Sequence, residues 1–152
     1  MNPYASHLAD RDPIAVIAAT PAELAGRTGT LTPEGANRSP APGKWSARQI
    51  VCHLADTEIA FGFRLRQGLA EKDHVIQPFD QDRWAERYDA YDLASALELF
   101  THLRQWNLLL VKSLAPADFD RPLSHPERGA MTYRTLVETM AGHDLNHLAQ
   151  LK

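Results

Sequence analysis

Two histidines near the C-terminus of this 152-residue chain, His143 and His147, lie four positions apart in the segment AGHDLNHLAQL. On an α-helix, this spacing places both imidazole rings on one face about one turn apart, where they can bind the same metal ion. The same spacing is also common by chance on helices that bind no metal. The pair alone therefore indicates a metal site only weakly.

A zinc protease of the HExxH type is the sharpest alternative, because such a helix supplies two zinc ligands and a glutamate base. Here the shorter Asp144 stands in the position of that glutamate, and only five residues follow His147. No downstream segment could then supply the third ligand that these proteases need. We therefore expect a third ligand from an upstream helix, as in four-helix bundles that project ligands into a shared core.

His53, in the segment QIVCHLADTE, is the upstream candidate, because it lies in a predicted helix next to Leu54 and is expected to face inward. A lone histidine on such a face is more often a buried core residue than a ligand. Together, His53, His143 and His147 would form a set of three neutral imidazoles with an open position for water or substrate. This arrangement is typical of catalytic zinc, although nickel, iron and copper also accept it.

Residues around these three histidines have less specific interpretations. Asp56 shares the helical face of His53, so it either accepts a hydrogen bond from a ligand imidazole or metal-bound water, or pairs with Arg48 or a loop. Cys52 is expected to be a small buried residue. The remaining histidines are expected to be solvated or incidental: His7, His74, His102 and His125.

Helices must position these residues, since apolar residues recur every three or four positions and no run alternates convincingly. The sequence predicts an all-α fold with helices that begin after Asp12, Ser46, Asp92 and Thr132. The first helix is expected to break or kink near Pro21. Residues 28 to 44 and 73 to 91 are predicted connections, and the second of these has room for a short helix near 80 to 87.

Two helices carry further signals. Ser46 and Gln49 form a capping box, which predicts a helix from 46 to about 71. The helix that follows Asp92 has apolar residues at steps of three and four, which predict its buried face. Those residues are Ala96, Leu99, Leu103, Trp106, Leu110 and Leu114. The four amphipathic helices and their long connections indicate a four-helix bundle that is not simply up-down-up-down.

The composition suits one domain spanning 1–152, with 44% apolar and 23% charged residues. A formal net charge of −3 argues against a dedicated nucleic-acid-binding protein. The single cysteine cannot form an intramolecular disulfide, and neither a signal peptide nor a membrane span is evident. We therefore expect a cytoplasmic protein that binds no nucleic acid and no membrane.

The segments KWSARQIVCHLADTE (44–58) and AGHDLNHLAQ (141–150) together resemble the DinB-like (DinB/YfiT) superfamily. This resemblance covers nearly the whole chain. It implies a four-helix bundle with a long crossover connection, commonly a homodimer, and a divalent metal ion held by three histidines. Those ligands correspond to His53, His143 and His147 of this sequence.

The resemblance also implies a range of activities, since family members include thiol-dependent S-transferases, a thiol-dependent maleylpyruvate isomerase and hydrolases. We expect an enzyme that uses one divalent metal ion, zinc or nickel, and acts on a small electrophilic substrate. A low-molecular-weight thiol would be its cosubstrate in S-transfer, and water would react in hydrolysis. The alternative is a non-catalytic metal-binding module that serves a stress response or senses a ligand.

Overall fold

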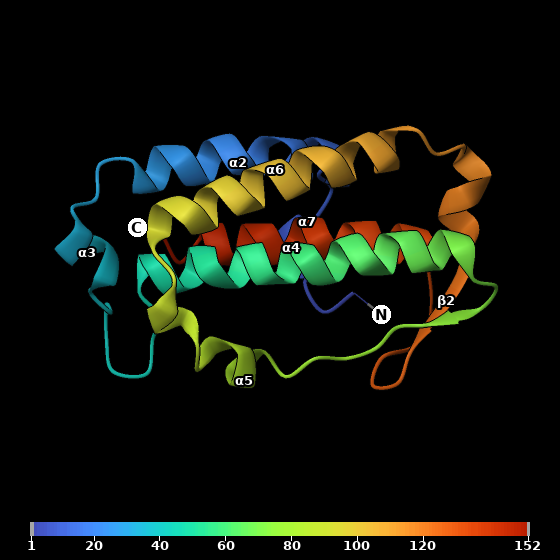
Figure 1. The fold of residues 1–152 in the computed structure, drawn as a ribbon. Helices are drawn as coiled ribbons and strands as arrows, with labels where there is room; N and C mark the ends of the chain where they lie inside the picture. Colours follow the sequence, from blue (N-terminus) through green and yellow to red (C-terminus); the bar gives the residue numbers. More distant parts are fainter. Residues whose placement is uncertain (1, 152) are drawn as a thin grey trace.

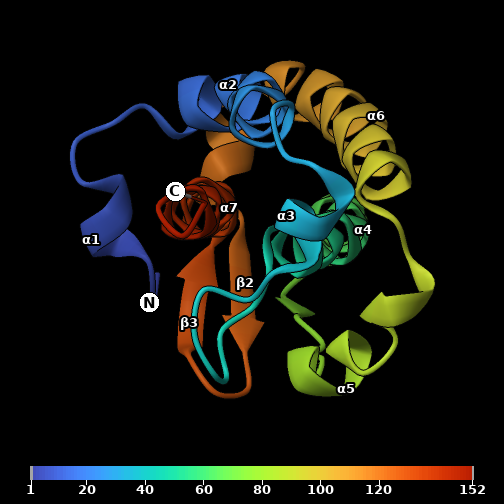
Figure 2. The same cartoon turned by 90° about the vertical axis from the view of Figure 1, so that its left-hand side faces the viewer.

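The computed structural model describes residues 2–151 and has four long helices (Figure 1). These are α2 (Pro13–Thr28), α4 (Ala47–Ala70), α6 (Leu93–Lys112) and α7 (Tyr133–Leu148). Viewed end-on, they form a ring in which α2 and α4 each contact both α6 and α7 (Figure 2). The neighbours α4 and α6 run in the same direction, so the chain between them returns along the bundle (Figure 1). The predicted four-helix bundle with a long crossover connection is confirmed.

Each predicted helix start agrees with the structure. Ser46 and Gln49 form the capping box, in which the Ser46 N–H donates to Gln49 Oε1 at 2.9 Å and the Gln49 N–H donates to Ser46 Oγ at 3.3 Å. Asp92 accepts a hydrogen bond from the N–H of Ser95 at 2.8 Å. Such caps satisfy N–H groups that have no partner inside the helix, which is why α4 and α6 begin where they do.

The predicted break near Pro21 is wrong, because α2 continues through it. Proline has no N–H, so the carbonyl of Ile17, four residues earlier, lacks its usual helical partner. The guanidinium of Arg104 on α6 donates to that carbonyl at 3.1 Å. A side chain from another helix therefore satisfies the group that Pro21 leaves unpaired.

The connections contain short elements. Helix α3 (Pro33–Asn37) lies within the predicted 28–44 connection, α5 (Gln81–Ala85) within the second one, and α1 (Ala5–Leu8) near the N-terminus. Two 3-10 turns complete the helical elements described in residues 2–151. They are Tyr88–Ala90 and Pro116–Asp120.

A small sheet, which the sequence did not predict, closes the end of the bundle where α4 ends and α7 begins (Figure 1). Its strands are β1 (His74–Val75), β2 (Pro122–His125) and β3 (Gly129–Thr132), in the order β1-β2-β3. β1 pairs with β2 in parallel, and β2 pairs with β3 antiparallel. Strands of two to four residues are too short for an alternating pattern to stand out in the sequence.

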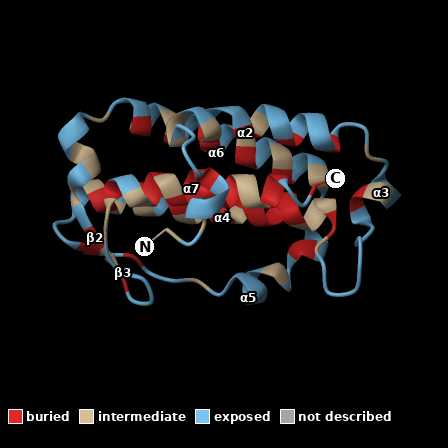
Figure 3. Ribbon diagram, turned by 180° about the vertical axis from the view of Figure 1, so that it is seen from behind, coloured by how far each residue is buried: buried red, intermediate tan, exposed pale blue. Residues whose placement is uncertain are grey.

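The predicted buried face of α6 is also wrong in part. Its buried residues are Ala96, Phe100, Arg104, Asn107 and Val111. Leu99 is 43% exposed and Trp106 is 63% exposed. The pattern was misleading because two of the inward-facing residues are polar. In the bundle as a whole, buried residues concentrate where the helices face one another (Figure 3).

No helix in residues 2–151 combines the length and apolar character needed to cross a bilayer.

Candidate metal centre

His53, His143 and His147 meet where α4 packs beside α7. Their rings are buried, and one nitrogen of each lies within 4.8 Å of one nitrogen of each of the others. The Nε2 atoms of His53 and His143 are 3.0 Å apart. Two nitrogen ligands on one tetrahedral zinc ion would be separated by about 3.3 Å, given Zn–N bonds of about 2.0–2.1 Å. The structure thus brings the three predicted ligands together at a spacing that suits a metal ion.

The protonation state of the cluster also suits a metal. Burial, reinforced by the charge of His147, lowers the pKa of His53 to about 3, and burial lowers the pKa of His147 to about 4. Burial likewise holds the pKa of His143 well below its usual range. All three imidazoles are therefore neutral at pH 7, which is the form that binds metals.

Two ring nitrogens of the cluster have no hydrogen-bond partner among the described residues, namely Nδ1 of His53 and Nδ1 of His147. Burying a polar atom without a partner carries a free-energy cost. The facing Nε2 atoms of His53 and His143 can share only one hydrogen between them. The three neutral imidazoles therefore offer nitrogen lone pairs that are close together and not all engaged by the protein, and a divalent cation can take one nitrogen of each ring.

Aromatic side chains surround the cluster and explain its low pKa values. The ring centroid of Trp45 lies 4.8 Å from that of His53 and 6.2 Å from that of His147, nearly parallel to the latter. Tyr4 packs edge-on against His143 at 5.3 Å. Such rings exclude water and disfavour a charged imidazole. Trp45, which immediately precedes the Ser46 cap, is therefore also part of the wall of the site.

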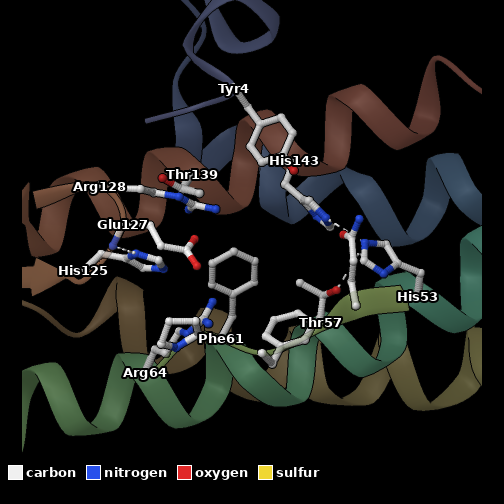
Figure 4. Close-up of a pocket in the computed structure, with 13 residues that line it drawn as sticks. Tyr4, His53, Thr57, Phe61, Arg64, His125, Glu127, Arg128, Thr139 and His143 are labelled. Atoms are coloured by element: carbon white, nitrogen blue, oxygen red, sulfur yellow. Dashed lines mark hydrogen bonds between the residues drawn. The ribbon is translucent and has the colours of Figure 1, made fainter. Parts of the chain in front are cut away.

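Two cavities adjoin the histidines. One, of about 310 Å³, is lined by His53, His143 and residues that extend along α4 to the β2–β3 turn (Figure 4). The other, of about 360 Å³, is lined by His147 and by residues of the 43–45 segment and the end of α7. Tyr4 and Gln81 line both. The cluster is thus reachable from two sides.

The centre of the bundle contains a cluster of charges instead of the histidines. Arg104 on α6 donates to Glu58 on α4 at 2.7 Å and pairs with Asp144 on α7. Thr20 on α2 donates to Asp144 at 2.8 Å. Asp144 follows His143, so it points about 100° away around the helix. The expectation that the histidines project into the bundle core is therefore corrected, since they face the side where α4 and α7 meet the N-terminal segment and the loops.

The pKa of Arg104 reflects this arrangement. Burial alone would lower it, but the charges of Asp144 and Glu58 outweigh burial and raise it. The arginine and its two carboxylates are all buried. The sequence does not predict this cluster. Each of these residues is indistinguishable from an ordinary exposed polar residue until its partner on another helix is known.

Other predicted residues lie elsewhere. Asp56 is half-buried in a separate cavity that it lines with Cys52, and no hydrogen bond joins it to a histidine among the described residues. The structure thus offers no support for a contact between Asp56 and a ligand. His74 and His125 were expected to be solvated but are 8% and 5% exposed, because the sheet buries them.

His125, Tyr4, Arg64 and Arg128 also line the cavity beside His53 and His143, a position that the sequence did not predict for them. His125 lies on β2, and Arg128 lies in the turn that follows it. Nothing in the local sequence distinguishes these residues from solvated loop side chains. Their placement depends on how the β2–β3 hairpin packs against the rest of the chain. His7 and His102 are exposed, as expected.

The fold and the cluster together define a helical-bundle protein with a candidate three-histidine metal site. Residues 17–151 match the family model of the DinB superfamily, and the chain belongs to this family.

Several relatives carry metal-related names. A protein of Oceanobacillus iheyensis, named "Putative metal-dependent hydrolase", is 34% identical over 80% of this chain and 71% of its own length. A Bacillus mycoides protein of the same description is 31% identical over 72% of this chain and 64% of its own. The chain thus spans about two thirds of the length of such relatives. It is similar in sequence to proteins that carry this name.

Solved structures agree with this assignment. YfiT from Bacillus subtilis, described as a probable metal-dependent hydrolase with an unusual four-helix bundle topology, superposes with a TM-score of 0.82 at 26% identity. The match covers 91% of this chain and 83% of YfiT. A mycothiol-dependent maleylpyruvate isomerase superposes with a TM-score of 0.71 at 10% identity, over 91% of this chain and 59% of the isomerase. The second likeness concerns the fold alone.

Proposed function

We propose that this protein is a metal-dependent enzyme that transfers a low-molecular-weight thiol to a small electrophilic substrate. The observation that carries the proposal is the position of the histidine cluster between two cavities that share Tyr4 and Gln81. A transfer reaction must bring two molecules to one centre, and two adjoining cavities meet that need. Catalysis of such a reaction gains from holding both reactants in place.

His53, His143 and His147 would hold the metal ion, zinc or nickel. When bound, a divalent ion at such a site stabilises a thiolate or a hydroxide at neutral pH. Trp45 and Tyr4 exclude water from the cluster, which strengthens electrostatic interactions inside it.

The thiol must come from outside the protein. Cys52 is the only cysteine of the chain, and it is buried. Burial raises the pKa of its thiol to about 11, so it carries almost no thiolate at neutral pH. It also lines a cavity other than the two beside the histidines. In thiol transfer, the thiol would therefore be a small cellular thiol bound as cosubstrate.

Hydrolysis is the second candidate, and the names of the relatives favour it. The same metal ion would then activate water in place of a thiol. The experiment that separates the two is a pair of assays with zinc-loaded or nickel-loaded protein. One assay offers monochlorobimane with bacillithiol, mycothiol or cysteine, and the other offers ester and amide substrates without a thiol.

The matched variants for these assays are His147→Ala, which removes a predicted ligand, and His102→Ala, which removes an exposed histidine of α6. Thiol-dependent product that is lost in His147→Ala and retained in His102→Ala supports transfer. Thiol-independent product with the same variant pattern supports hydrolysis. Metal binding without product in either assay would instead favour the non-catalytic binding module.

We also propose that the protein is a homodimer formed through the outer face of α4 and α6. This face carries five exposed apolar side chains: Ile59, Phe63, Leu99, Trp106 and Leu109. The two helices pack against each other, and Ile59 and Leu99 line one surface cavity. Large apolar groups gathered on one surface favour association, because association removes them from water.

A further inference from the structure

The cavity beside His53 and His143 has a second end, away from these histidines, where a group of charged residues lies. Figure 4 shows Arg64, His125, Glu127 and Arg128 gathered at one end and the two histidines at the other, with Phe61 between them. The ring of Phe61 lies 6.1 Å from the ring of His143 and 5.8 Å from the guanidinium carbon of Arg64. A molecule of a few carbons can therefore reach from the histidines to the arginine.

Arg64 is the best-defined group at this end. Its guanidinium lies near the rings of Phe61 and Phe79, at 5.8 and 5.3 Å. It donates to the carbonyl of Gln77 at 2.8 Å, and none of the ion pairs among residues 2–151 includes it. Burial and the charge of Arg128 lower its pKa to about 10, so it stays charged at pH 7. A partly desolvated cation without a carboxylate partner is a ready ligand for an anion.

The neighbouring groups leave this end positive. Figure 4 draws Arg128 at the same end of the cavity as Arg64 and His125. Its charge adds to the lowering of their pKa values by burial, and at Tyr4 it opposes the rise in pKa that burial causes. Burial is the larger cause at His125, and His125 is therefore neutral at pH 7. Glu127 contributes the opposite charge. Two guanidinium groups and one carboxylate therefore line this end of the cavity.

We propose that this basic end binds an anionic oxygen group of the carboxylate class on the small substrate, and so holds its reactive carbon at the histidines. The inference rests on the proposed function, because it treats this cavity as the substrate cavity. Arginine suits the task, since its planar fork donates two parallel hydrogen bonds to one carboxylate. The aromatic rings beside Arg64 hold the guanidinium in place and, unlike a carboxylate, do not neutralise its charge. The substrates would therefore be short electrophiles that carry an acid group.

Binding alone tests this proposal, without turnover. Calorimetry would compare glutarate with glutaramide, its uncharged analogue, on both metal-free and zinc-loaded protein. We expect glutarate to bind the metal-free protein and glutaramide to bind at least about tenfold more weakly, as expected when a charge-assisted contact is lost. The metal-free measurement separates the basic end from coordination of the carboxylate by a metal ion.

Three variants locate the contact. Arg64→Gln should weaken glutarate binding by about tenfold or more, whereas Glu127→Gln should strengthen it by about threefold or more, because a repelling carboxylate is removed. Arg134→Gln, a matched change at an exposed arginine outside the cavity, should leave it unchanged. Equal binding of glutarate and glutaramide, or an unchanged dissociation constant in both cavity variants, overturns the proposal. If Arg64→Gln does not fold, the strengthening by Glu127→Gln decides the question.

Once turnover is measured, the same variants identify which molecule carries the acid group. If the electrophile carries it, Arg64→Gln raises the KM of an acidic electrophile and leaves the KM of its amide analogue unchanged. If the thiol carries it, the KM of the thiol rises instead. Absence of turnover would count against the proposed function and would leave the binding result intact.

Discussion

The main chain of Tyr4 crosses α7 at Gly142 so closely that a Cβ atom on residue 142 would lie 2.6 Å from the Tyr4 carbonyl oxygen. The side chain of Tyr4 packs at the same place against His143 and lines both cavities. The absence of a side chain at Gly142 therefore lets the N-terminal segment form a wall of the candidate site. The segments around Tyr4 and Gly142 are more than 130 residues apart in sequence, and each limits how the other can pack.

Gly142→Ala should displace the N-terminal segment, because the added methyl group meets backbone atoms that cannot rotate away. We expect a loss of about 1–3 kcal/mol in the free energy of unfolding and faster trypsin cleavage after the exposed Arg11. Gly26→Ala is the control, since a Cβ on this helical glycine meets nothing within 4 Å and should stabilise α2 by about 0.5–1 kcal/mol. A Gly142→Ala protein with unchanged stability and cleavage would contradict the close contact.

The buried histidines should make the metal-free protein less stable in mild acid. In the folded chain the pKa of His53 is about 3 and that of His147 about 4, whereas an unfolded histidine titrates near about 6.5. Below pH 6.5 the unfolded chain therefore binds protons that the folded chain does not. Their contribution to stability is complete above this pH and decreases as the pH falls toward 4. Urea denaturation of metal-free protein at pH 7.5, 6.5 and 5.5 measures the slope.

Two glutamine variants assign this slope to the cluster. His53→Gln should make the free energy of unfolding less dependent on pH, because it removes one of the shifted groups. His102→Gln should retain the wild-type slope, since His102 is exposed on α6. Equal slopes in the two variants would show that other groups cause the acid sensitivity.

Arg104→Met should destabilise the bundle strongly. The substitution leaves the carboxylates of Glu58 and Asp144 buried without their cation, and breaking a buried charge cluster in this way costs about 3–5 kcal/mol. Adding Glu58→Gln and Asp144→Asn to the same protein removes both charges and should recover part of the loss. Arg134→Gln, at an exposed arginine, should change stability by no more than about 0.5 kcal/mol. Urea denaturation would measure all three, and a loss below about 1 kcal/mol in Arg104→Met would contradict the description of this cluster.

The proposed dimer face can be tested at its two aromatic residues. Trp106→Glu and Phe63→Glu should each convert the dimer into monomers, because a buried carboxylate on an apolar interface has no partner. Val75→Glu is the matched control, since Val75 is 58% exposed on β1 and lies outside this face. Sedimentation velocity separates the two species. A monomeric wild-type protein at micromolar concentration, or a dimer that withstands both face variants, would reject the interface.

The helix starts could be predicted because a cap depends on residues within one turn of one another. Ser46 with Gln49, and Asp92 with Ser95, need no information from elsewhere in the chain. The His143 and His147 pair was recognisable for the same reason. The third member, His53, needed an expectation about which face of α4 is covered, together with the resemblance of two separated segments to a known family.

Predictions that depended on distant partners were less successful. The apolar stripe of α6 placed Trp106 in the core, whereas the inward face carries Arg104. An arginine can be buried there only because Glu58 and Asp144, 46 and 40 residues away, compensate its charge. His125 belongs to a cavity wall only because β2 pairs with β3 at one end of the bundle.

The sequence by itself determined the four helices, their caps and the His143 and His147 pair, because these follow from interactions between residues that are close along the chain. The tertiary structure decided that the charged cluster occupies the centre of the bundle, and it also placed the histidines at the side of the bundle and the arginines at the far end of their cavity. The physical reason is that the free energy of burying a charge or a polar ring depends on which partners reach it. Those partners come from segments that only the folded chain brings together.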